Sequence, residues 1–262
     1  MNSIVCLKEV PDTETRIEVR AGKVVEEGIQ YVVNPYDEFA LEEALKWQET
    51  FGGKVTLVSL GPDRARESIL KGLAMGADEV YHLADEAFQH GDAYATAKAL
   101  AAAIQKLGGY DVIFCGKQAV DEDNAAVGVM LAELLNLPHV SVVSKLELGA
   151  DGKSVRAERE IEGGREVVEL SLPAVITAQK GLNEPRYPSF RGIRQARSKP
   201  FTQWTVADVG LDAGAVGAGG AKLEIVEILP PPERLPGRII PGEPADAAKE
   251  VVRLLREEAK VI

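Results

Sequence analysis

The first 140 residues alternate short apolar runs with amphipathic stretches, and this alternation constrains the fold more than any other feature. The apolar runs are nearly continuous, as is typical of parallel strands that helices cover on both faces. Strands that alternate with helices in this way predict an α/β fold, with a Rossmann-like parallel sheet flanked by helices. The expected strands are Ser3–Val10, Lys54–Leu60, Glu79–Leu83 and Asp111–Cys115, and the expected helices are Asp37–Thr50, Arg64–Met75, Ala93–Leu107 and Asn124–Leu135.

After residue 140 the pattern changes to a β-rich extension, followed by an irregular arm and a terminal amphipathic stretch. Glycine and alanine dominate Ala213–Gly220, which we expect to be flexible, and Pro230–Pro232 should be extended. The last stretch predicts a helix over Asp246–Lys260. The expected strands are Val140–Leu148, Ser154–Ile161, Glu166–Leu170 and Val175–Ala178, and a hairpin over Arg16–Val19 and Lys23–Glu27 follows the first strand.

A chain of 262 residues favours one core with appendages. We expect a nucleotide-binding core in residues 1–200, including a basic segment at 178–200, and an arm with a terminal helix in residues 201–262. A helix on such an arm needs a surface to lie against, either on its own domain or on another chain.

Composition excludes several classes of function. The net charge of −11 argues against nucleic-acid binding, because phosphate contacts need an excess of lysine and arginine. No run approaches the roughly 20 apolar residues of a membrane span, so we expect no direct membrane insertion. The first residues lack the pattern of a secretory signal, and the two cysteines suggest a reducing compartment. A cytoplasmic location is expected.

Motifs for catalysis and metal binding are absent from the sequence. It contains no G-x-G-x-x-G after the first strand, no G-x-x-x-x-G-K-[ST], no H-E-x-x-H and no C-x-x-C. The three histidines lie far apart, so we expect neither a metal site nor a catalytic residue. Cys6 and Cys115 are interpreted as small buried hydrophobic residues.

Three segments are expected to meet at the carboxyl edge of the sheet, where open parallel sheets bind ligands. They are Cys6, the turn N-P-Y-D at 34–37, and the string G-K-Q-A-V-D-E-D-N-A-A-V-G at 116–128. Small residues let backbone amides approach a phosphate, and a helix N-terminus favours an anion. The carboxylates at 121–123 would repel a phosphate unless they turn away or act as caps. A nucleotide loop and an ordinary capped helix both remain open.

One segment is basic although the chain is acidic. It is either a solvated face or a docking surface that steers an acidic partner. Residues 178–199 contain Lys180, Arg186, Arg191, Arg194, Arg197 and Lys199 against a single acidic residue, Glu184.

Several strings together resemble the β subunits of electron-transfer flavoproteins. They are N-P-Y-D-E-F-A-L-E-E-A at 34–44, A-M-G-A-D at 74–78, the loop at 116–128, and L-N-E-P-R-Y at 182–187. Their order and separations match from near residue 3 to about residue 200, and the terminal helix also fits. The resemblance implies a Rossmann-like fold of the adenine nucleotide alpha hydrolase-like type.

The resemblance also implies a heterodimer with an α subunit that holds most of a redox-active FAD. The β subunit would bury an AMP that has no redox role. By position, AMP would contact Cys6, Asn34, Pro35, Tyr36, Asp37, Leu60, Gly116, Lys117, Gln118, Ala119, Val120, Asp121, Glu122, Asp123, Asn124, Ala125, Ala126 and Val127.

The basic segment matches the family's recognition loop for acyl-CoA dehydrogenases and related flavin dehydrogenases. Phe190 would be its apolar anchor, where the family usually has leucine. Arg186 and Tyr187 would support the loop, and Arg194 and Arg197 would act as rim charges. Two further positions, Thr13 and Glu160, match contacts with the FAD domain of the α subunit. Thr13 replaces a tyrosine of some members, which puts an aromatic contact with the flavin in doubt.

Some family members hold a second FAD in place of AMP and bifurcate electrons from NADH. They typically read D-G-D-T-A-Q-V-G-P where this chain reads D-E-D-N-A-A-V-G-V at 121–129, which favours AMP. The strings P-D-T at 11–13 and D-E-A-F-Q-H-G-D at 85–92 look more like the bifurcating branch.

We therefore expect an electron-carrier subunit rather than an enzyme. It would take electrons from acyl-CoA dehydrogenases of fatty acid β-oxidation, or from related flavin dehydrogenases, and pass them to an electron-transfer-flavoprotein quinone oxidoreductase. The alternatives are half of an NADH-dependent bifurcating flavoprotein and a free-standing nucleotide-sensing module.

Overall fold

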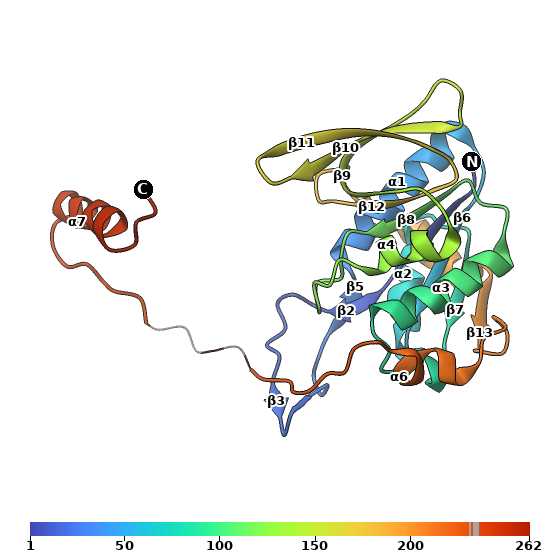
Figure 1. Ribbon diagram of the computed structural model, residues 1–262, viewed down its shortest axis with the longest axis horizontal. Helices are drawn as coiled ribbons and strands as arrows, with labels where there is room; N and C mark the ends of the chain where they lie inside the picture. The colour runs from blue at the N-terminus through green and yellow to red at the C-terminus, as the bar shows by residue number, and fades with distance from the viewer. Residues whose placement is uncertain (231, 233–235) are drawn as a thin grey trace. The chain divides into compact units, whose positions relative to one another are not determined.

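A computed structural model of the chain describes residues 1–230, 232 and 236–262. Within these residues the main sheet has nine strands, in the order β11-β10-β9-β12-β8-β1-β6-β7-β13 (Figure 1). The strands are β1 Ser3–Cys6, β6 Val55–Leu60, β7 Glu79–Leu83, β8 Val112–Gly116, β9 His139–Leu148, β10 Ser154–Ile161, β11 Gly164–Ser171, β12 Ala174–Ala178 and β13 Phe201–Trp204.

The helices include four that flank the main sheet and three shorter or peripheral ones. Two small antiparallel pairs, β2 with β5 and β3 with β4, lie outside the main sheet. The helices are α1 Pro35–Phe51, α2 Arg66–Met75, α3 Ala93–Leu107, α4 Val127–Leu135, α5 Phe190–Ala196, α6 Gly217–Gly220 and α7 Pro244–Glu257, and the additional strands are β2 Glu9–Pro11, β3 Val19–Arg20, β4 Lys23–Val24 and β5 Tyr31–Val33.

The predicted α/β fold with a Rossmann-like parallel sheet is confirmed. Strands β12, β8, β1, β6, β7 and β13 are all parallel to their neighbours. β9 also runs parallel to β12, whereas β10 and β11 continue the sheet as antiparallel strands. Figure 1 shows these last two strands as a long hairpin at one end of the sheet. The β-rich extension therefore enlarges the same sheet.

The alternating side chains of β1 explain why helices cover both faces of the sheet. Val5 packs in a cluster with side chains of α1 and α2, whereas Ile4 and Cys6 pack in a second cluster with α3 and α4. Successive side chains of a strand point to opposite faces, so one apolar strand supplies both clusters. The near-continuous apolar run of this strand in the sequence reflects its burial on both faces.

Two predicted elements are wrong in ways that affect the candidate site. The first strand was expected over Ser3–Val10, but β1 ends at Cys6 and β2 pairs instead with β5. The fourth helix was expected from Asn124, but α4 begins at Val127. Asp123 and Ala125 have φ angles of 53° and 50°, which no right-handed helix contains. Residues 124–126 therefore belong to the loop.

Beyond residue 200 the chain still belongs to the core, which differs from the expected boundary. β13 pairs with β7, and the compact unit formed by Met1–Ile17 and Val25–Val226 extends well past residue 200. The stretch Ala213–Gly220, expected as a flexible stretch, forms a 3-10 turn and α6, and Val216 between them is buried. Of the predicted extended Pro230–Pro232, Pro231 lies outside the described residues.

Residues 18–24 and 227–262 fall outside this core unit. The terminal helix α7 begins at Pro244, two residues before the predicted start, and has no buried residue. Its apolar side chains Val251, Val252 and Leu255 are 40%, 46% and 37% exposed. Among the described residues, no helix combines the length and apolar composition needed to cross a bilayer.

Candidate functional site

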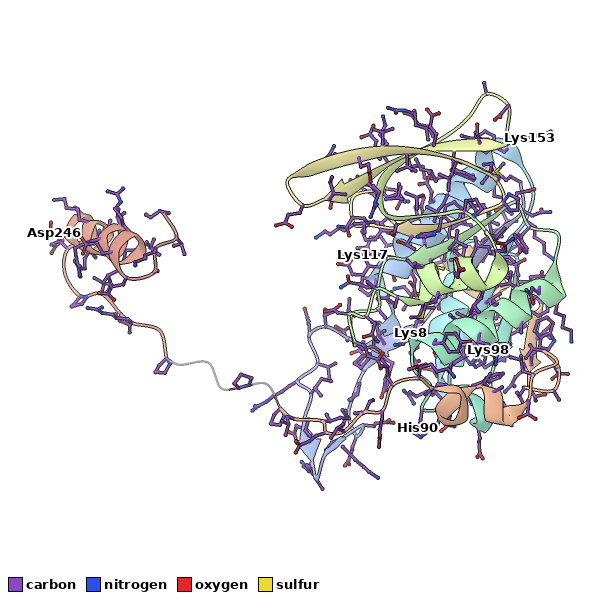
Figure 2. The ribbon with its side chains drawn as sticks, viewed as in Figure 1. Lys8, His90, Lys98, Lys117, Lys153 and Asp246 are labelled. Carbon is purple, nitrogen blue, oxygen red and sulfur yellow. The ribbon has the colours of Figure 1, made fainter. Side chains whose placement is uncertain are left out.

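The strand order reverses at β1, and this reversal fixes the position of the candidate site. From β1 the chain proceeds outward to β6 and β7, and α3 then returns it to β8 on the other side of β1. Ligands of open α/β sheets bind at such a switch point, outside the carboxyl ends of the strands. Lys8 follows β1 and Lys117 follows β8, and Figure 2 labels both.

A buried pair of polar side chains, Asn34 and Asp37, ties the predicted segments together. The Asn34 side-chain amide donates to Asp37 Oδ1 at 2.9 Å and to the Gln118 carbonyl at 2.9 Å. Asn34 Oδ1 accepts from the Val120 amide at 3.3 Å. We call Asn34 and Asp37 the clasp, because they join the turn before α1 to the loop after β8.

Asp37 is fully buried and links the other two segments. Its carboxylate accepts from the backbone amides of Lys8 at 2.7 Å and Gly116 at 3.1 Å. Burial raises the pKa of Asp37 to about 7, although hydrogen bonds from Lys8, Asn34 and Gly116 act in the opposite direction. Buried carboxylates are retained where several donors satisfy them. Asp37 is therefore a structural member of the site rather than a solvent-facing ligand group.

Gly116 is the residue on which this close approach depends. A Cβ at this position would overlap Asp37 Oδ1 and would meet Tyr36 Cβ at 2.7 Å. Any side chain here would separate β8 from the start of α1. The next residue, Lys117, donates its amide to the Ala178 carbonyl at 3.0 Å and places its ammonium 5.0 Å from the centre of the Tyr36 ring.

The three carboxylates of the loop each have a partner within the site. The sequence had suggested that they would repel a phosphate unless they turn away or act as caps. Asp121 forms an ion pair with Lys8 at 2.8 Å. Asp123 accepts from the Gln118 side chain at 2.5 Å, and Glu122 accepts from Asn124 at 2.8 Å. None of them caps α4. Their charge is directed toward these partners rather than toward the helix start.

The start of α4 has no side-chain cap that would compete with an anionic group. Ala126 occupies the N-cap position, and no side chain accepts from the first amides of the helix. Ala125 and Ala126 add little bulk beside those amides. An uncapped helix N-terminus flanked by small residues suits a phosphate, so the residues present fit a nucleotide. The other predicted members of the loop, Ala119 and Val127, are half-buried in its wall.

The remaining predicted members lie at the strand ends beneath the loop. Cys6 ends β1 and is buried, as the sequence predicted, and Leu60 ends β6 and is half-buried. Cys115 is the neighbour of Cys6 on β8, and its hydrogen bond with Cys6 and its burial raise the pKa of the Cys115 thiol. Such thiols are unreactive. Among the described residues, no group of histidine, cysteine and carboxylate side chains could hold a metal ion.

The basic segment begins with an internal anchor rather than a free charge. Arg186 donates Nε to Glu42 Oε2 at 2.8 Å and Nη2 to Glu42 Oε1 at 2.9 Å, and a further pair joins it to Glu49. These hydrogen bonds hold the pKa of Arg186 above its ordinary value. The neighbouring Asn183 donates to the Phe39 carbonyl and to Glu43. The segment is therefore fastened to α1.

Beyond that anchor the segment displays apolar side chains to solvent. Tyr187 is 94% exposed and Phe190 is 92% exposed. Phe190 begins α5, and the Ser189 side chain caps this helix. No periodic pattern predicted α5, because seven residues are too few to show one. Arg194 and Arg197 are exposed at the end of this helix. Exposed aromatic residues beside arginine have the composition of interface hot spots.

The two positions matched to the FAD domain, Thr13 and Glu160, belong neither to the loop site around Asn34 and Asp37 nor to the basic segment. Thr13 is exposed in the turn after β2. Glu160 lies near the end of β10 and accepts from the Gln179 side chain at 2.8 Å.

The sequence analysis did not include Lys8 in the site, although its position just after a buried strand was a signal. The fold and the clasp together define the class of the chain: a parallel α/β protein with a candidate ligand site at its topological switch point.

Comparisons with known proteins identify the family. A family model described as the electron transfer flavoprotein domain matches residues 21–209. The chain is 42% identical over 257 residues to electron transfer flavoprotein subunit beta of Thermoanaerobacterium thermosaccharolyticum, covering 97% of this chain and 98% of that one. The Bacillus subtilis protein of the same name is 39% identical over 263 residues, covering 100% of both chains. A subunit of the caffeyl-CoA reductase–Etf complex of Acetobacterium woodii is 38% identical over 261 residues, covering 98% and 99%.

The chain belongs to the electron transfer flavoprotein β subunit family. The resemblance read from the sequence is therefore confirmed. Proteins of this family serve as electron carriers rather than as classical enzymes, which agrees with the lack of a nucleophile or acid–base pair in the sequence.

Proposed function

We propose that this chain is the β subunit of a heterodimeric electron-transfer flavoprotein that holds AMP at the switch point. An α subunit holds most of the redox-active FAD. Electrons arrive from an acyl-CoA dehydrogenase, or a related flavin dehydrogenase, docked on residues 178–200, and leave to a quinone oxidoreductase. The observation that carries the proposal is the clasp of Asn34 and Asp37, which sets the loop of residues 116–127 beside the uncapped start of α4.

AMP would be held by the loop and by the ends of β1 and β6. Backbone amides at 126–128 would bind its phosphate, and Gly116 and the clasp would keep the loop in place. AMP supplies no redox chemistry. Its contribution is the free energy of binding to the folded chain, which stabilises the subunit.

The apolar surfaces of the arm support an α-subunit partner. Leu223, Ile225 and Val226 at the end of the core unit are 75%, 75% and 92% exposed, and α7 buries none of its residues. Apolar side chains at this density mark surfaces that another chain covers. We infer that the arm from Leu223 onward, including α7, packs on the α subunit, and that Thr13 and Glu160 would contact its FAD domain.

A second candidate function is a bifurcating subunit that binds FAD in place of AMP. The observation that favours it is the Acetobacterium woodii relative, which is named for a complex with caffeyl-CoA reductase. The strings at 11–13 and 85–92 point the same way, whereas Glu122 in the loop favours AMP.

We predict that the chain is stable only with its α subunit. Expressed alone it should aggregate or elute without flavin, because the apolar side chains of the arm and α7 remain in water. Co-expressed with an α subunit, it should elute as a 1:1 flavin-bearing complex in size-exclusion chromatography. That complex should relay electrons from a substrate-reduced acyl-CoA dehydrogenase to a dye. A monodisperse, nucleotide-loaded monomer that ignores the α subunit would contradict the proposal and favour a free-standing nucleotide module.

A further inference from the structure

The six basic residues of the segment 178–199 divide into two groups. Arg186 and Lys199 make internal contacts, whereas the other four, Lys180, Arg191, Arg194 and Arg197, are exposed. The charge of this segment is therefore only partly available to a partner. Its last basic residue contributes in a different way.

Lys199 inserts its ammonium among carbonyl groups of the last turn of α2 and of the two residues that follow the helix. Its Nζ donates to the Leu73 carbonyl at 3.0 Å, the Gly76 carbonyl at 3.2 Å and the Ala77 carbonyl at 2.5 Å. All three donor positions of the ammonium are thus used. Carbonyls at a helix C-terminus lack partners within the helix and attract positive charge, and α2 has no basic residue of its own in its last turn.

The burial of Lys199 separates this contact from a surface ion pair. Burial lowers the pKa of Lys199, and the carboxylate of Asp78 acts in the opposite direction. The ammonium is turned toward the protein, so a docked partner would not meet it. The next residue starts the return of the chain to the sheet, because the Pro200 carbonyl accepts from the Val80 amide at 3.0 Å.

The short helix α5 lies directly on the same turn of α2. Gly192 of α5 is so close to the Ala74 carbonyl that a Cβ would overlap that oxygen. Ala196 at the end of α5 is 3% exposed and belongs to the core cluster that includes Leu73 and Ala74. Gly192 and Lys199 therefore fix α5 on α2 from two sides. Arg186 fixes the other end of the segment on α1.

We propose that Lys199 is a positioning residue for dehydrogenase docking: it locks α5 on the C-terminal turn of α2, so that Phe190 and Ile193, which is 51% exposed on the same helix, are presented in one fixed orientation. This inference rests on the proposed docking function of the segment. A preorganised surface binds more tightly because fewer side chains and backbone torsions are ordered on association. Lys199 acts by keeping α5 ordered, and it does not present its charge to the partner.

The test uses Lys199→Met in the flavin-loaded heterodimer, with an acyl-CoA dehydrogenase and its saturated acyl-CoA as electron donor. Methionine keeps an apolar stem of similar length but cannot donate to the three carbonyls. The apparent KM of the dehydrogenase for the heterodimer should rise at least about fivefold, in the range of alanine-scan effects at interfaces, with kcat unchanged. The rise should persist as salt is added, because no exposed charge is lost. Lys199→Arg should restore most of the affinity.

Two matched variants separate the effect of a displaced α5 from the effect of a lost surface charge. Gly192→Ala pushes α5 away from α2 without touching Lys199, and it should raise KM in the same salt-independent way. Arg194→Gln removes an exposed charge, and its effect should fade as salt rises. Trypsin should cut after Arg191, Arg194 and Arg197 faster in Lys199→Met than in the wild type. Gly192→Ala also serves as the deciding variant if Lys199→Met fails to fold.

An unchanged KM and an unchanged rate of tryptic cleavage in Lys199→Met and Gly192→Ala would overturn the inference. If Phe190→Ala still raised KM in that experiment, docking through the segment would stand and only the positioning role would fail. If none of the variants changed KM, the proposed docking function itself would be wrong.

Discussion

Phe190→Ala is expected to weaken docking of the heterodimer to its dehydrogenase about thirtyfold, while folding and flavin content stay unchanged. The side chain is 92% exposed at the start of α5, so its removal leaves no cavity. Truncating an aromatic anchor in an interface typically costs about 2 kcal/mol or more, which corresponds to that factor in affinity. The neighbouring Tyr187, 94% exposed, would share the same apolar patch.

The measurement is steady-state electron transfer from an acyl-CoA dehydrogenase at varied concentrations of the heterodimer. Phe51→Ala provides a matched control, because Phe51 is also a partly exposed phenylalanine, 46% exposed at the end of α1. It should leave the affinity unchanged. Arg194→Gln and Arg197→Gln should mainly slow association, with effects that decline as salt rises. A Phe190→Ala heterodimer with wild-type affinity would remove this residue from the docking surface.

Ala126→Leu is expected to exclude AMP from the heterodimer without removing the flavin. Ala126 is the N-cap of α4, the residue before it has a φ of 50°, and no side chain caps the first amides of the helix. A leucine beside these amides fills space that a phosphate needs. The affinity for AMP should fall about tenfold or more, because overpacking typically costs about 1–3 kcal/mol and about 1.4 kcal/mol is a factor of ten in Kd. The variant should therefore lose its AMP when the complex is diluted and gel-filtered without added nucleotide.

AMP content is read by chromatography of the nucleotides released on denaturation. Ala126→Gly is the matched control, since it adds no bulk and should retain AMP. Losing a ligand that was present at about 100 times its Kd removes about 2.7 kcal/mol of stability, so Ala126→Leu should also melt at a lower temperature. Electron transfer should persist once the complex is assembled. Full AMP content in Ala126→Leu would show that this helix start does not bind the nucleotide.

The parallel core could be predicted from the sequence because its strands are buried on both faces. Runs such as Val55–Leu60 have no polar alternation, and the helix Ala93–Leu107 matches its predicted bounds residue for residue. The predicted ends of helices and strands were wrong where backbone conformation, rather than hydrophobicity, determines the end of the element. Asp123 and Ala125 adopt left-handed backbone conformations, so α4 begins later than expected, and alanine in particular gives no sequence signal for that conformation.

The segments that form the candidate site could be predicted from the sequence, but the hydrogen bonds and ion pairs between them could not. The carboxyl ends of β1 and β8 had to meet once the sheet was parallel, so the turn at 34–37 and the loop at 116–127 were expected together. The roles of single side chains were not visible. Asp37 accepts from three donors and Lys8 neutralises Asp121, and both facts depend on distances between residues far apart in the sequence.

The basic segment shows the same limit. Counting charges placed Arg186 and Lys199 with the exposed arginines, because composition does not distinguish a solvated side chain from one that reaches a helix end. The structure places Arg186 on Glu42 and Lys199 on the carbonyls after α2. Tertiary contacts made by long side chains leave no periodic pattern.

The cofactor content of the co-purified heterodimer tests the central claim most directly. The complex would be denatured, and the released flavin and nucleotide would be separated by chromatography and quantified against protein. The proposed function predicts one FAD and one AMP per heterodimer, with AMP lost selectively in Ala126→Leu. Two FAD and no AMP per heterodimer would contradict the AMP assignment and establish the bifurcating type. A complex without any nucleotide besides the flavin of the α subunit would contradict a nucleotide site at the switch point altogether.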